Sequence, residues 1–358
     1  MLKCLSYMDF QTNYPLSELT TFRIGGPASF YAHVANLNEL KEALDFAQQK
    51  NLSVLVLGGG SNVLISDQGF VGLVIQINFK GIEKVSEDKD SVMLKVAAGE
   101  IWDDVVAFAE KNNFWGIENL SHVPGKTGAV PVQNVGCYGQ EASDVVEKIE
   151  VLGLNSQKVK EFTKTELDFN YRTSKLNQEW KNKYVILSVY FRLSKIPSPN
   201  LTYVDLKKYF AGRDKAMVSL NEIRTALKQI RANKFPDLTQ MGTVGSFFKN
   251  FILTEEQYNT LVYCTKQNFG QEGVDRLIQV VNKFPQKNGI KVPTAFLLDI
   301  CGLKGKAVGE AKLWEKQPVV IVNTGNAKAA DVLELFKQVQ AEILAKTGMR
   351  VTAEPEFI

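Results

Sequence analysis

Residues 242–250, Gly-Thr-Val-Gly-Ser-Phe-Phe-Lys-Asn, combine residue types that suit proton transfer to a small polar reactant. The two glycines free the backbone to adopt positive φ angles and to approach a ligand closely. The phenylalanines can anchor the segment in a core, which leaves the Ser246 hydroxyl near Lys249 and Asn250. A hydroxyl held beside a cation and an amide can protonate or orient a reactant in a dry pocket. A glycine turn with an incidental serine explains the same pattern, and the segment alone slightly favours that interpretation.

A run of three glycines, Gly58, Gly59 and Gly60, follows a short apolar segment that predicts a strand over residues 53–57. A dinucleotide-binding turn requires a helix directly after its glycines. Here Val63-Leu64-Ile65 predicts another strand, so the pattern is not that fingerprint. Successive backbone N–H groups can still form an anion nest for a phosphate. A tight hairpin would not need three glycines, and phosphate binding is therefore favoured.

The segment Pro-Gly-Lys-Thr-Gly at residues 124–128 imitates a phosphate-binding P-loop. The P-loop pattern requires an earlier glycine where this chain has Leu120, which excludes that class of nucleotide hydrolase. The segment belongs to an irregular stretch over residues 116–139 that is rich in glycine and proline. Irregular stretches of this length are usually functional. Its small residues and its amide pair suit a backbone that wraps a flat cofactor.

Two further patterns are weak by themselves. Tyr171 precedes Arg172, whose planar guanidinium can bind a carboxylate or phosphate through two parallel hydrogen bonds. A surface Tyr-Arg pair is nevertheless common. Glu354 and Glu356 flank a proline near the end of the chain, where an acidic pair is usually a solvated tail.

Composition narrows the classes of protein that fit. The chain has 358 residues, of which 45% are hydrophobic and 23% are charged, and its net charge is +3. This composition is typical of a globular protein with two or three domains. The scattered lysines do not indicate nucleic-acid binding. The first residues lack the apolar core of a secretion signal, no apolar run is long enough to span a bilayer, and the four separated cysteines indicate reduced thiols.

The elements that must position these residues alternate between strands and helices, which predicts an α+β or α/β architecture. The apolar spacing predicts helices over residues 37–47, 102–111, 220–230, 254–267, 293–301 and 331–346. Strands are predicted over 53–57, 63–65, 73–75, 92–96, 148–154, 184–193 and 318–323, with a closing strand over 350–352. The Pro- and Ser-containing residues 196–200 predict a domain boundary.

Six segments, taken together and in order, resemble the UDP-N-acetylenolpyruvoylglucosamine reductases of bacterial peptidoglycan synthesis. They lie at residues 20–28 (Thr-Thr-Phe-Arg-Ile-Gly-Gly-Pro-Ala), 57–64, 124–139, 171–174 (Tyr-Arg-Thr-Ser), 242–250 and 353–356 (Ala-Glu-Pro-Glu). Residues 201–206 also resemble the extra loop of the longer subtype, whose tyrosine, here Tyr203, closes over the substrate. The resemblance covers essentially the whole chain.

The resemblance implies an α+β fold with a two-part FAD-binding domain of the PCMH type, followed by a smaller α/β substrate-binding domain. The FAD-binding domain is expected over residues 1–198, in subdomains of about 1–75 and 76–198. The substrate-binding domain is expected over 199–358, with its last strand returning to the site. Non-covalent FAD would contact Leu57, Gly58, Gly59, Gly60, Ser61, Asn62, Pro124, Gly125, Gly128, Ala129, Gln133 and Asn134. No metal is implied.

The resemblance also implies that NADPH reduces the flavin, which passes hydride to the enolpyruvyl double bond of the nucleotide sugar to give UDP-N-acetylmuramate. Ser246 would donate the proton, and Arg172 and Glu354 would stabilise the enolate-like intermediate. The remaining substrate contacts would be Tyr138, Tyr171, Tyr203, Lys234 and Asn250. Such enzymes are cytoplasmic and serve cell-wall synthesis, cell shape and cell division; a monomer is expected.

The family pattern is not followed everywhere, and two other functions remain open. Ala129 and Val130 stand where some relatives carry serines, and Trp314 stands where histidine is frequent. An oxidase of small alcohols with the same class of FAD domain is one alternative, and such oxidases often tether the flavin to His or Cys. A non-catalytic protein that binds nucleotide sugars is the other.

Overall fold

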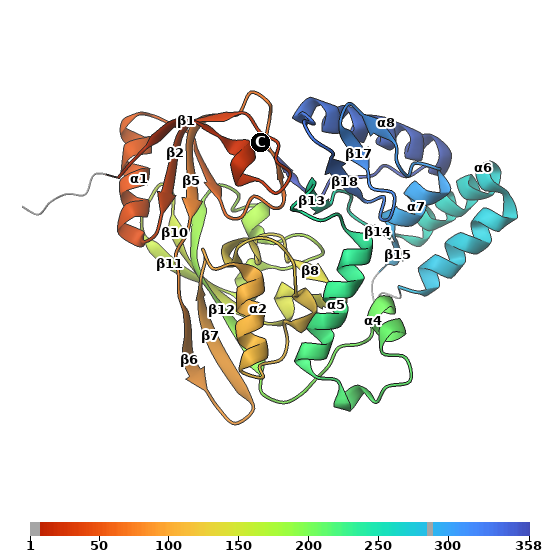
Figure 1. Ribbon diagram of the computed structural model, residues 1–358, viewed down its shortest axis with the longest axis horizontal. Helices are drawn as coiled ribbons and strands as arrows, with labels where there is room; N and C mark the ends of the chain where they lie inside the picture. Colours follow the sequence, from red (N-terminus) through yellow and green to blue (C-terminus); the bar gives the residue numbers. More distant parts are fainter. Residues whose placement is uncertain (1–7, 285–288) are drawn as a thin grey trace, which may run out of the picture. The chain divides into compact units, whose positions relative to one another are not determined.

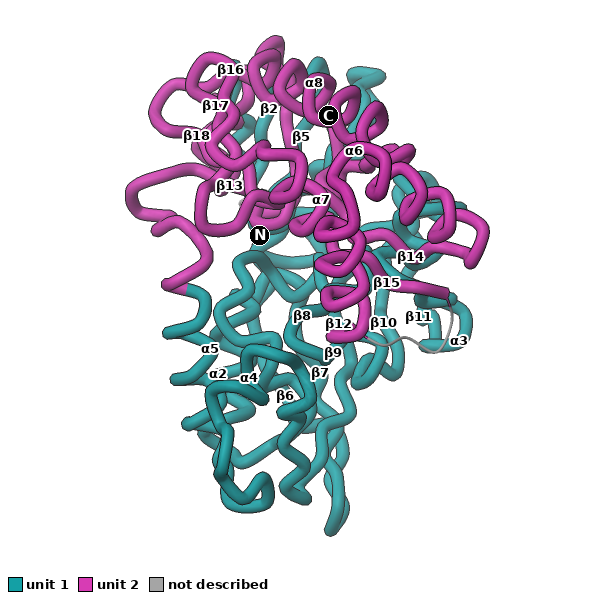
Figure 2. Tube along the Cα trace, turned by 90° about the vertical axis from the view of Figure 1, so that its right-hand side faces the viewer, with its two compact units in different colours: residues 1–14, 28–60, 70–231 teal, residues 15–27, 61–69, 232–358 magenta. Residues whose placement is uncertain are grey.

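The computed structural model describes residues 8–284 and 289–358, which form two compact units (Figure 2). Unit 1 contains the described residues up to Tyr14, then Ala28–Gly60 and Phe70–Arg231. Unit 2 contains Pro15–Pro27, Ser61–Gly69 and Ala232–Ile358. Cys4 and the first seven residues, on which two of the expectations depend, lie outside the described residues.

Two sheets form the framework of unit 1 (Figure 1). The first has the order β1-β2-β5-β3, and β5 pairs in parallel with both β2 and β3. The second has the order β11-β10-β12-β7-β6 and is antiparallel at each of its pairings. The strands are β1 Gln11–Pro15, β2 Pro27–Val34, β3 Val54–Leu57, β5 Phe70–Ile77, β6 Ile82–Glu87, β7 Ser91–Ala97, β10 Val146–Gly153, β11 Val159–Thr163 and β12 Tyr184–Ser194.

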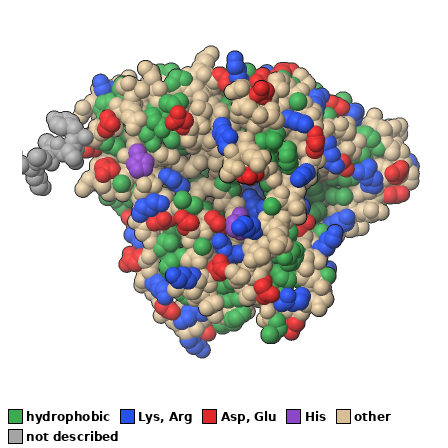
Figure 3. Space-filling model, viewed as in Figure 1, with side chains coloured by type: hydrophobic (Ala, Val, Ile, Leu, Met, Phe, Trp, Pro, Cys, Tyr) green, Lys and Arg blue, Asp and Glu red, His purple; other side chains and the backbone are tan. Residues whose placement is uncertain are grey.

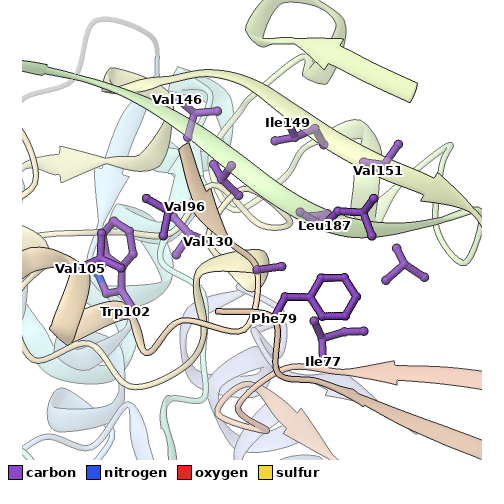
Figure 4. Close-up of a cluster of buried hydrophobic side chains, with 14 of the residues drawn as sticks. Ile77, Phe79, Val96, Trp102, Val105, Val130, Val146, Ile149, Val151 and Leu187 are labelled. Carbon is purple, nitrogen blue, oxygen red and sulfur yellow. The ribbon is translucent and has the colours of Figure 1, made fainter. Parts of the chain in front are cut away.

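Helices α1 (Leu37–Gln49) and α2 (Trp102–Lys111) cover these sheets because each has one apolar face. The side chain of Asn36 accepts hydrogen bonds from two backbone N–H groups of the first turn of α1, as its position before the helix predicts. Figure 4 shows Trp102 and Val105 of α2 beside Val96 of β7, within the core of unit 1. This packing fixes the start of α2, where the Trp102 N–H donates a hydrogen bond to the glycine-rich stretch at the Gly125 carbonyl.

Three further α-helices belong to unit 1: α3 (Lys164–Leu167), α4 (Val204–Tyr209) and the longer α5 (Leu220–Lys234), which runs into unit 2. The buried face of α5 joins a small core with Trp115, Tyr138 and Leu206. Because of this packing, unit 1 extends to Arg231, whereas the sequence places a boundary near residue 198. Two short strands flank Tyr138, β8 (Gly136–Cys137) before it and β9 (Gln140–Glu141) after it.

Unit 2 is built around the antiparallel sheet β13-β18-β17-β16. Helix α8 packs on β16 and β17, and helices α6 and α7 lie beside it (Figure 2). The elements are β4 Val63–Leu64, β13 Gly242–Ser246, β14 Phe251–Leu253, α6 Glu255–Asn282, β15 Ile290–Val292, α7 Thr294–Ile300, β16 Ala307–Val308, β17 Ala311–Leu313, β18 Val320–Asn323, α8 Ala329–Thr347 and β19 Glu356–Phe357.

Two segments from the first 70 residues are incorporated into unit 2. The side chain of Asn323 donates a hydrogen bond to the Phe22 carbonyl (3.1 Å). The carboxylate of Asp67 accepts hydrogen bonds from the backbone N–H groups of Ala329 (2.8 Å) and Ala330 (3.0 Å) at the start of α8. A carboxylate satisfies the unpaired N–H groups there and interacts favourably with the helix dipole.

Two predicted elements differ from the structure. The helix predicted over 254–267 begins as expected, but helical structure resumes after a break at Gly270 (φ 67°) and extends to Asn282. The closing strand predicted over 350–352 is wrong, because the last strand is β19, which pairs in parallel with β4. Residues 352–354 instead make single backbone hydrogen bonds to residues 247–249.

Candidate active site

In unit 1 the two glycine-rich loops approach each other through their backbones. A Cβ atom added to Gly59 would lie 2.8 Å from the Cα of Gly125, closer than side chains tolerate. Gly60 (φ 60°) and Gly125 (φ 128°) have positive φ angles that favour glycine. A Cβ atom added to Gly58 would make only ordinary contacts, at 3.8 Å. The glycines therefore serve different purposes, and Gly59 is required for the approach.

The second loop is held by the elements on either side of it. The Gly125 carbonyl accepts a hydrogen bond from the Trp102 N–H at the start of α2 (3.1 Å), and the Gly128 N–H donates to the Ala98 carbonyl (2.9 Å). The Lys126 ammonium donates to the Ile77 carbonyl at the end of β5 (2.6 Å). Burial, with a smaller contribution from Lys80, lowers the pKa of Lys126. The loop thus presents its backbone from a fixed position.

The remaining predicted cofactor residues fall into two groups. Leu57, Pro124, Ala129, Gln133 and Asn134 lie in unit 1 with the glycines, whereas Ser61 and Asn62 lie in unit 2. The buried side chain of Asn134 donates to Glu141 Oε2 (2.9 Å) and to the Asn170 carbonyl (3.2 Å), and its oxygen accepts from the Ser143 N–H (2.9 Å). The side chain of Asn134 therefore holds together three protein segments in this structure.

Arg172 is half-buried in unit 1 and has a positive φ angle of 56°. Its Nη2 donates to the Gly136 carbonyl (2.7 Å), and its guanidinium lies over the Tyr171 ring, 5.2 Å from the ring centroid. A Cβ atom added to Gly136 would lie 3.2 Å from Arg172 Nη1, so the glycine makes room for the guanidinium. Non-glycine residues at positive φ are strained and cluster at functional sites. This geometry fits a cation positioned for an anionic ligand.

A cluster of aromatic and polar side chains lies near Arg172. The rings of Tyr138 and Tyr203 meet edge to face at 5.3 Å. Burial is the largest cause that raises the pKa of Tyr203 to about 12 and that of Cys137 to about 11, while Arg231 and Arg172 oppose the shift of the thiol. Burial likewise raises the pKa of Tyr138, which has a φ angle of 47°. These phenols are therefore neutral hydrogen-bonding and stacking groups at neutral pH.

In unit 2 the main chain brings Ser246 and Glu354 together although 107 positions separate them along the sequence. Ser246 ends β13, and the N–H of Glu354 donates to the carbonyl of the next residue, Phe247 (2.7 Å). The side-chain amide of Asn62 donates to the Glu354 carbonyl (3.4 Å). Glu354 is half-buried, whereas Glu356 is exposed. The structure thus separates two acids that the sequence pattern leaves equivalent.

The other predicted substrate residues of unit 2 lie at the ends of elements. The Asn250 side chain accepts a hydrogen bond from the Thr294 N–H at the start of α7 (3.0 Å). Lys234 ends α5, and its carbonyl accepts from the Trp314 indole N–H (3.0 Å). Trp314 therefore has a structural contact at the position where the sequence departs from the family pattern. Ser246 and Glu354 belong to unit 2, whereas Arg172 belongs to unit 1.

Sequence reasoning missed a buried polar group behind the tyrosines, formed by Glu118, Asn119 and Gln140. Asn119 is fully buried and Glu118 is 1% exposed. Charged residues are rarely buried to this degree unless they are paired. Neither position stands out in a sequence, because burial of a polar side chain inside an irregular stretch produces no periodic pattern.

Cationic and anionic side chains are interspersed over the face shown in Figure 3. Within residues 8–284 and 289–358, no group of three or more His, Cys, Asp or Glu side chains is arranged to hold a metal ion. The helices of that same part of the chain include none long and apolar enough to cross a membrane.

Comparison with known proteins identifies two domains along this chain. Residues 28–159 match the model of an FAD-binding domain, and residues 237–358 match that of the C-terminal domain of UDP-N-acetylenolpyruvoylglucosamine reductase. The fold and the matched domain define a flavoprotein with a separate C-terminal domain. The predicted α+β class is confirmed.

The matching relatives are more specific. The chain is 34% identical to the UDP-N-acetylenolpyruvoylglucosamine reductase of Flavobacterium johnsoniae, over 98% of this chain and 100% of the relative. The reductase of Bdellovibrio bacteriovorus is also 34% identical, over 97% and 99%. The crystal structure of the reductase from Thermus caldophilus is similar with a TM-score of 0.67, at 24% identity, over 98% and 99% of the two chains. The chain belongs to the UDP-N-acetylenolpyruvoylglucosamine reductase family.

Proposed function

We propose that this chain reduces the enolpyruvyl group of UDP-N-acetyl-3-O-(1-carboxyvinyl)-glucosamine to give UDP-N-acetylmuramate, a peptidoglycan precursor. NADPH is the proposed reductant and FAD the proposed, non-covalently bound cofactor. The observation that carries this proposal is the backbone hydrogen bond from Glu354 to Phe247, the residue after Ser246, together with the bond from the Asn62 amide to the Glu354 carbonyl, in a chain of this family. These contacts bring the backbone of the serine segment close to the backbone of the acid.

The residues of unit 1 fit FAD. Gly59 and Gly125 bring two loops together through their backbones, and a single Cβ atom would disturb that approach. Backbone N–H groups of such loops can bind a pyrophosphate, and Gly58 and Gly60 are the proposed contacts. FAD, when bound, supplies the hydride transfer chemistry. The side chain of Cys137 donates to the Asn119 carbonyl (3.1 Å), which favours a structural role for this thiol over a flavin tether.

Arg172 is the proposed partner of the substrate carboxylate. Hydride addition β to a carboxylate builds negative charge on the carboxylate side, so a fixed cation there lowers the barrier. The guanidinium is already oriented by the Gly136 carbonyl and the Tyr171 ring. A pre-oriented fork costs little reorganisation when the charge develops.

Ser246 is the proposed donor of the proton that the α carbon then requires. The ordinary pKa of a serine hydroxyl is high, so a cation, Lys249 or Arg172, is expected to assist it. Glu354 is proposed to act beside it on the same intermediate. Tyr138, Tyr171, Tyr203, Lys234 and Asn250 are proposed to bind the substrate or the nicotinamide. We further propose that the protein is a cytoplasmic monomer.

Anaerobic titration of the purified protein tests the function. NADPH should bleach the flavin absorbance, and the enolpyruvyl substrate should restore it. Ser246→Ala should bind FAD and be bleached normally but be reoxidised more slowly by roughly 10²–10⁴-fold. Reoxidation at the normal rate would remove Ser246 from the proposed role.

The same sample separates the alternatives. Flavin that remains in the supernatant after acid precipitation supports the reductase, whereas flavin that precipitates with the protein supports a tethered oxidase. A colourless protein that binds the nucleotide sugar without turnover would instead be a binding protein.

A further inference from the structure

We propose that a polar network of the buried Glu118, Asn119 and Gln140 and the partly buried Asn200 positions the Tyr138–Tyr203 pair for the nucleotide-sugar substrate. The inference rests on the proposed function, because it takes these tyrosines as substrate contacts. The four residues are positioning residues, since they act through the tyrosines. All six belong to unit 1.

The carboxylate of Glu118 is the buried centre of this network. It accepts hydrogen bonds from the Gly116 N–H (2.7 Å) and from the side-chain amide of Gln140 (2.8 Å). Burial raises the pKa of Glu118, and the backbone N–H groups of Gly116, Glu118 and Asn200 together with the Gln140 amide oppose that rise. Each of these partners donates a hydrogen bond. The position therefore suits a carboxylate, which only accepts, better than a glutamine amide, which also donates. Glu118 therefore ties three separate segments to one point.

Asn119 extends the network to the tyrosine segments. Its side-chain amide donates to the carbonyl of Tyr138 (2.8 Å) and to the carbonyl of Asn200 (2.8 Å). Its backbone N–H donates to Gln140 Oε1 (2.7 Å). One fully buried side chain thus bridges the residue that carries the first ring and the residue three positions before the second. The strained φ angle of Tyr138 requires such support.

Asn200 is the anchor of the segment that leads to Tyr203. Residues 195–203 contain no helix or strand, and residues 196–198 are exposed. The Asn200 side-chain amide donates to the Gly139 carbonyl (2.8 Å), and its oxygen accepts from the N–H and hydroxyl of Thr202. No regular ladder fixes this segment, so these side-chain hydrogen bonds hold it together with the packing of Leu201 and Tyr203 against the small core of α5. Removing the anchor should displace Tyr203 relative to Tyr138.

The resulting functional signature is weaker substrate binding with intact chemistry. Both rings would remain in the protein, but their edge-to-face arrangement would be occupied for a smaller fraction of the time. Apparent affinity falls in proportion to the population of the competent arrangement. The FAD loops are held by other contacts, through Trp102, Ala98 and Ile77. FAD content should therefore not change.

Asn200→Asp tests the anchor with little change in shape. The carboxylate keeps an acceptor for Thr202 but replaces the donor to the Gly139 carbonyl by a second acceptor. We expect the KM for the enolpyruvyl substrate to rise about 2- to 10-fold, the effect of one broken hydrogen bond. The kcat should stay within about twofold, and FAD content should match the wild type. Asn119→Leu should have the same signature with a larger rise, provided that it folds.

Thr202→Val is the matched control, because it removes a contact of Asn200 but leaves the bond to Gly139. It should leave KM unchanged. Tyr203→Ala reports separately on the proposed function. If Tyr203→Ala raises KM and Asn200→Asp does not, the inference is overturned and the proposed role of Tyr203 stands. If Tyr203→Ala leaves KM unchanged, that role is overturned together with the inference. An equal loss of kcat and FAD content in Asn200→Asp would indicate general damage and would also overturn it.

Discussion

Replacement of Gly59 by alanine tests whether the approach of the two glycine-rich loops requires a missing side chain. The φ angle of Gly59 lies outside the left-handed region, so alanine causes no backbone strain there. The new methyl group would instead lie 2.8 Å from the Cα and 3.2 Å from the carbonyl carbon of Gly125. These are backbone atoms that cannot rotate away, and the loops must separate.

The expected cost follows from the nature of this contact. Extra carbon atoms in a packed region destabilise proteins by about 1–3 kcal/mol. For a unit of this size each kcal/mol lowers Tm by roughly 2–4 °C. Gly59→Ala should therefore unfold at a Tm lower by roughly 2–12 °C, even after FAD is removed, and it should retain less flavin. Thermal unfolding of the apoprotein and flavin content per chain are the measurements.

Gly58→Ala is the matched control in the same loop. Its methyl group would meet the Cβ atoms of Ala129 and Lys126 at 3.8 Å, which is ordinary van der Waals contact. The apoprotein should therefore keep the wild-type Tm. Equal stability of the two apoprotein variants would refute the packing argument for Gly59. Loss of flavin from Gly58→Ala alone would place the cofactor directly against Gly58.

Three other expectations concern the side chains of the site. Arg172→Lys keeps the charge but loses the planar fork, so turnover should fall by roughly 10- to 100-fold with NADPH-driven bleaching intact; a lysine variant as active as the wild type would mean that a point charge suffices. Glu354→Gln should impair turnover strongly and Glu356→Gln, at an exposed position, should not; equal small effects would return the segment to a solvated tail. Because burial raises the pKa of Tyr203 from 10.0 to about 12, its contribution to stability is complete below pH 10 and is lost as the pH rises to about 12. Denaturant unfolding against pH should show a smaller loss over this window in Tyr203→Phe, and an unchanged profile would contradict the shift.

Local patterns predicted most elements of this fold. The helix α2 has the predicted bounds, and Asn36 caps α1 as its position before an apolar repeat indicates. The strand after the glycine run excluded a dinucleotide-binding turn, and β4 confirms it. These features depend on side-chain spacing and on backbone propensity within a few residues, which a sequence records directly.

The break in α6 shows where local patterns end. The apolar spacing weakens before Gly270, and the chain resumes helical structure because side chains such as the buried Leu277 and the partly buried Val280 pack in the core of unit 2. The final strand was also placed wrongly. Its position depends on pairing with β4, nearly 300 residues earlier in the chain, and no local pattern encodes a distant partner.

The sequence by itself determined the family, the order of the motifs and the residue types that can do chemistry. The tertiary structure decided which groups meet and which are buried. It separates half-buried Glu354 from exposed Glu356. In an extended chain these two residues would lie on the same face, because they are two positions apart. It shows that Gly59 is required by a neighbouring backbone, and that Asp67 and Phe22 serve unit 2 although they come from the first 70 residues. The buried hydrogen bonds of Glu118 and Asn119 belong to this second group, because their partners come from segments that only folding brings together.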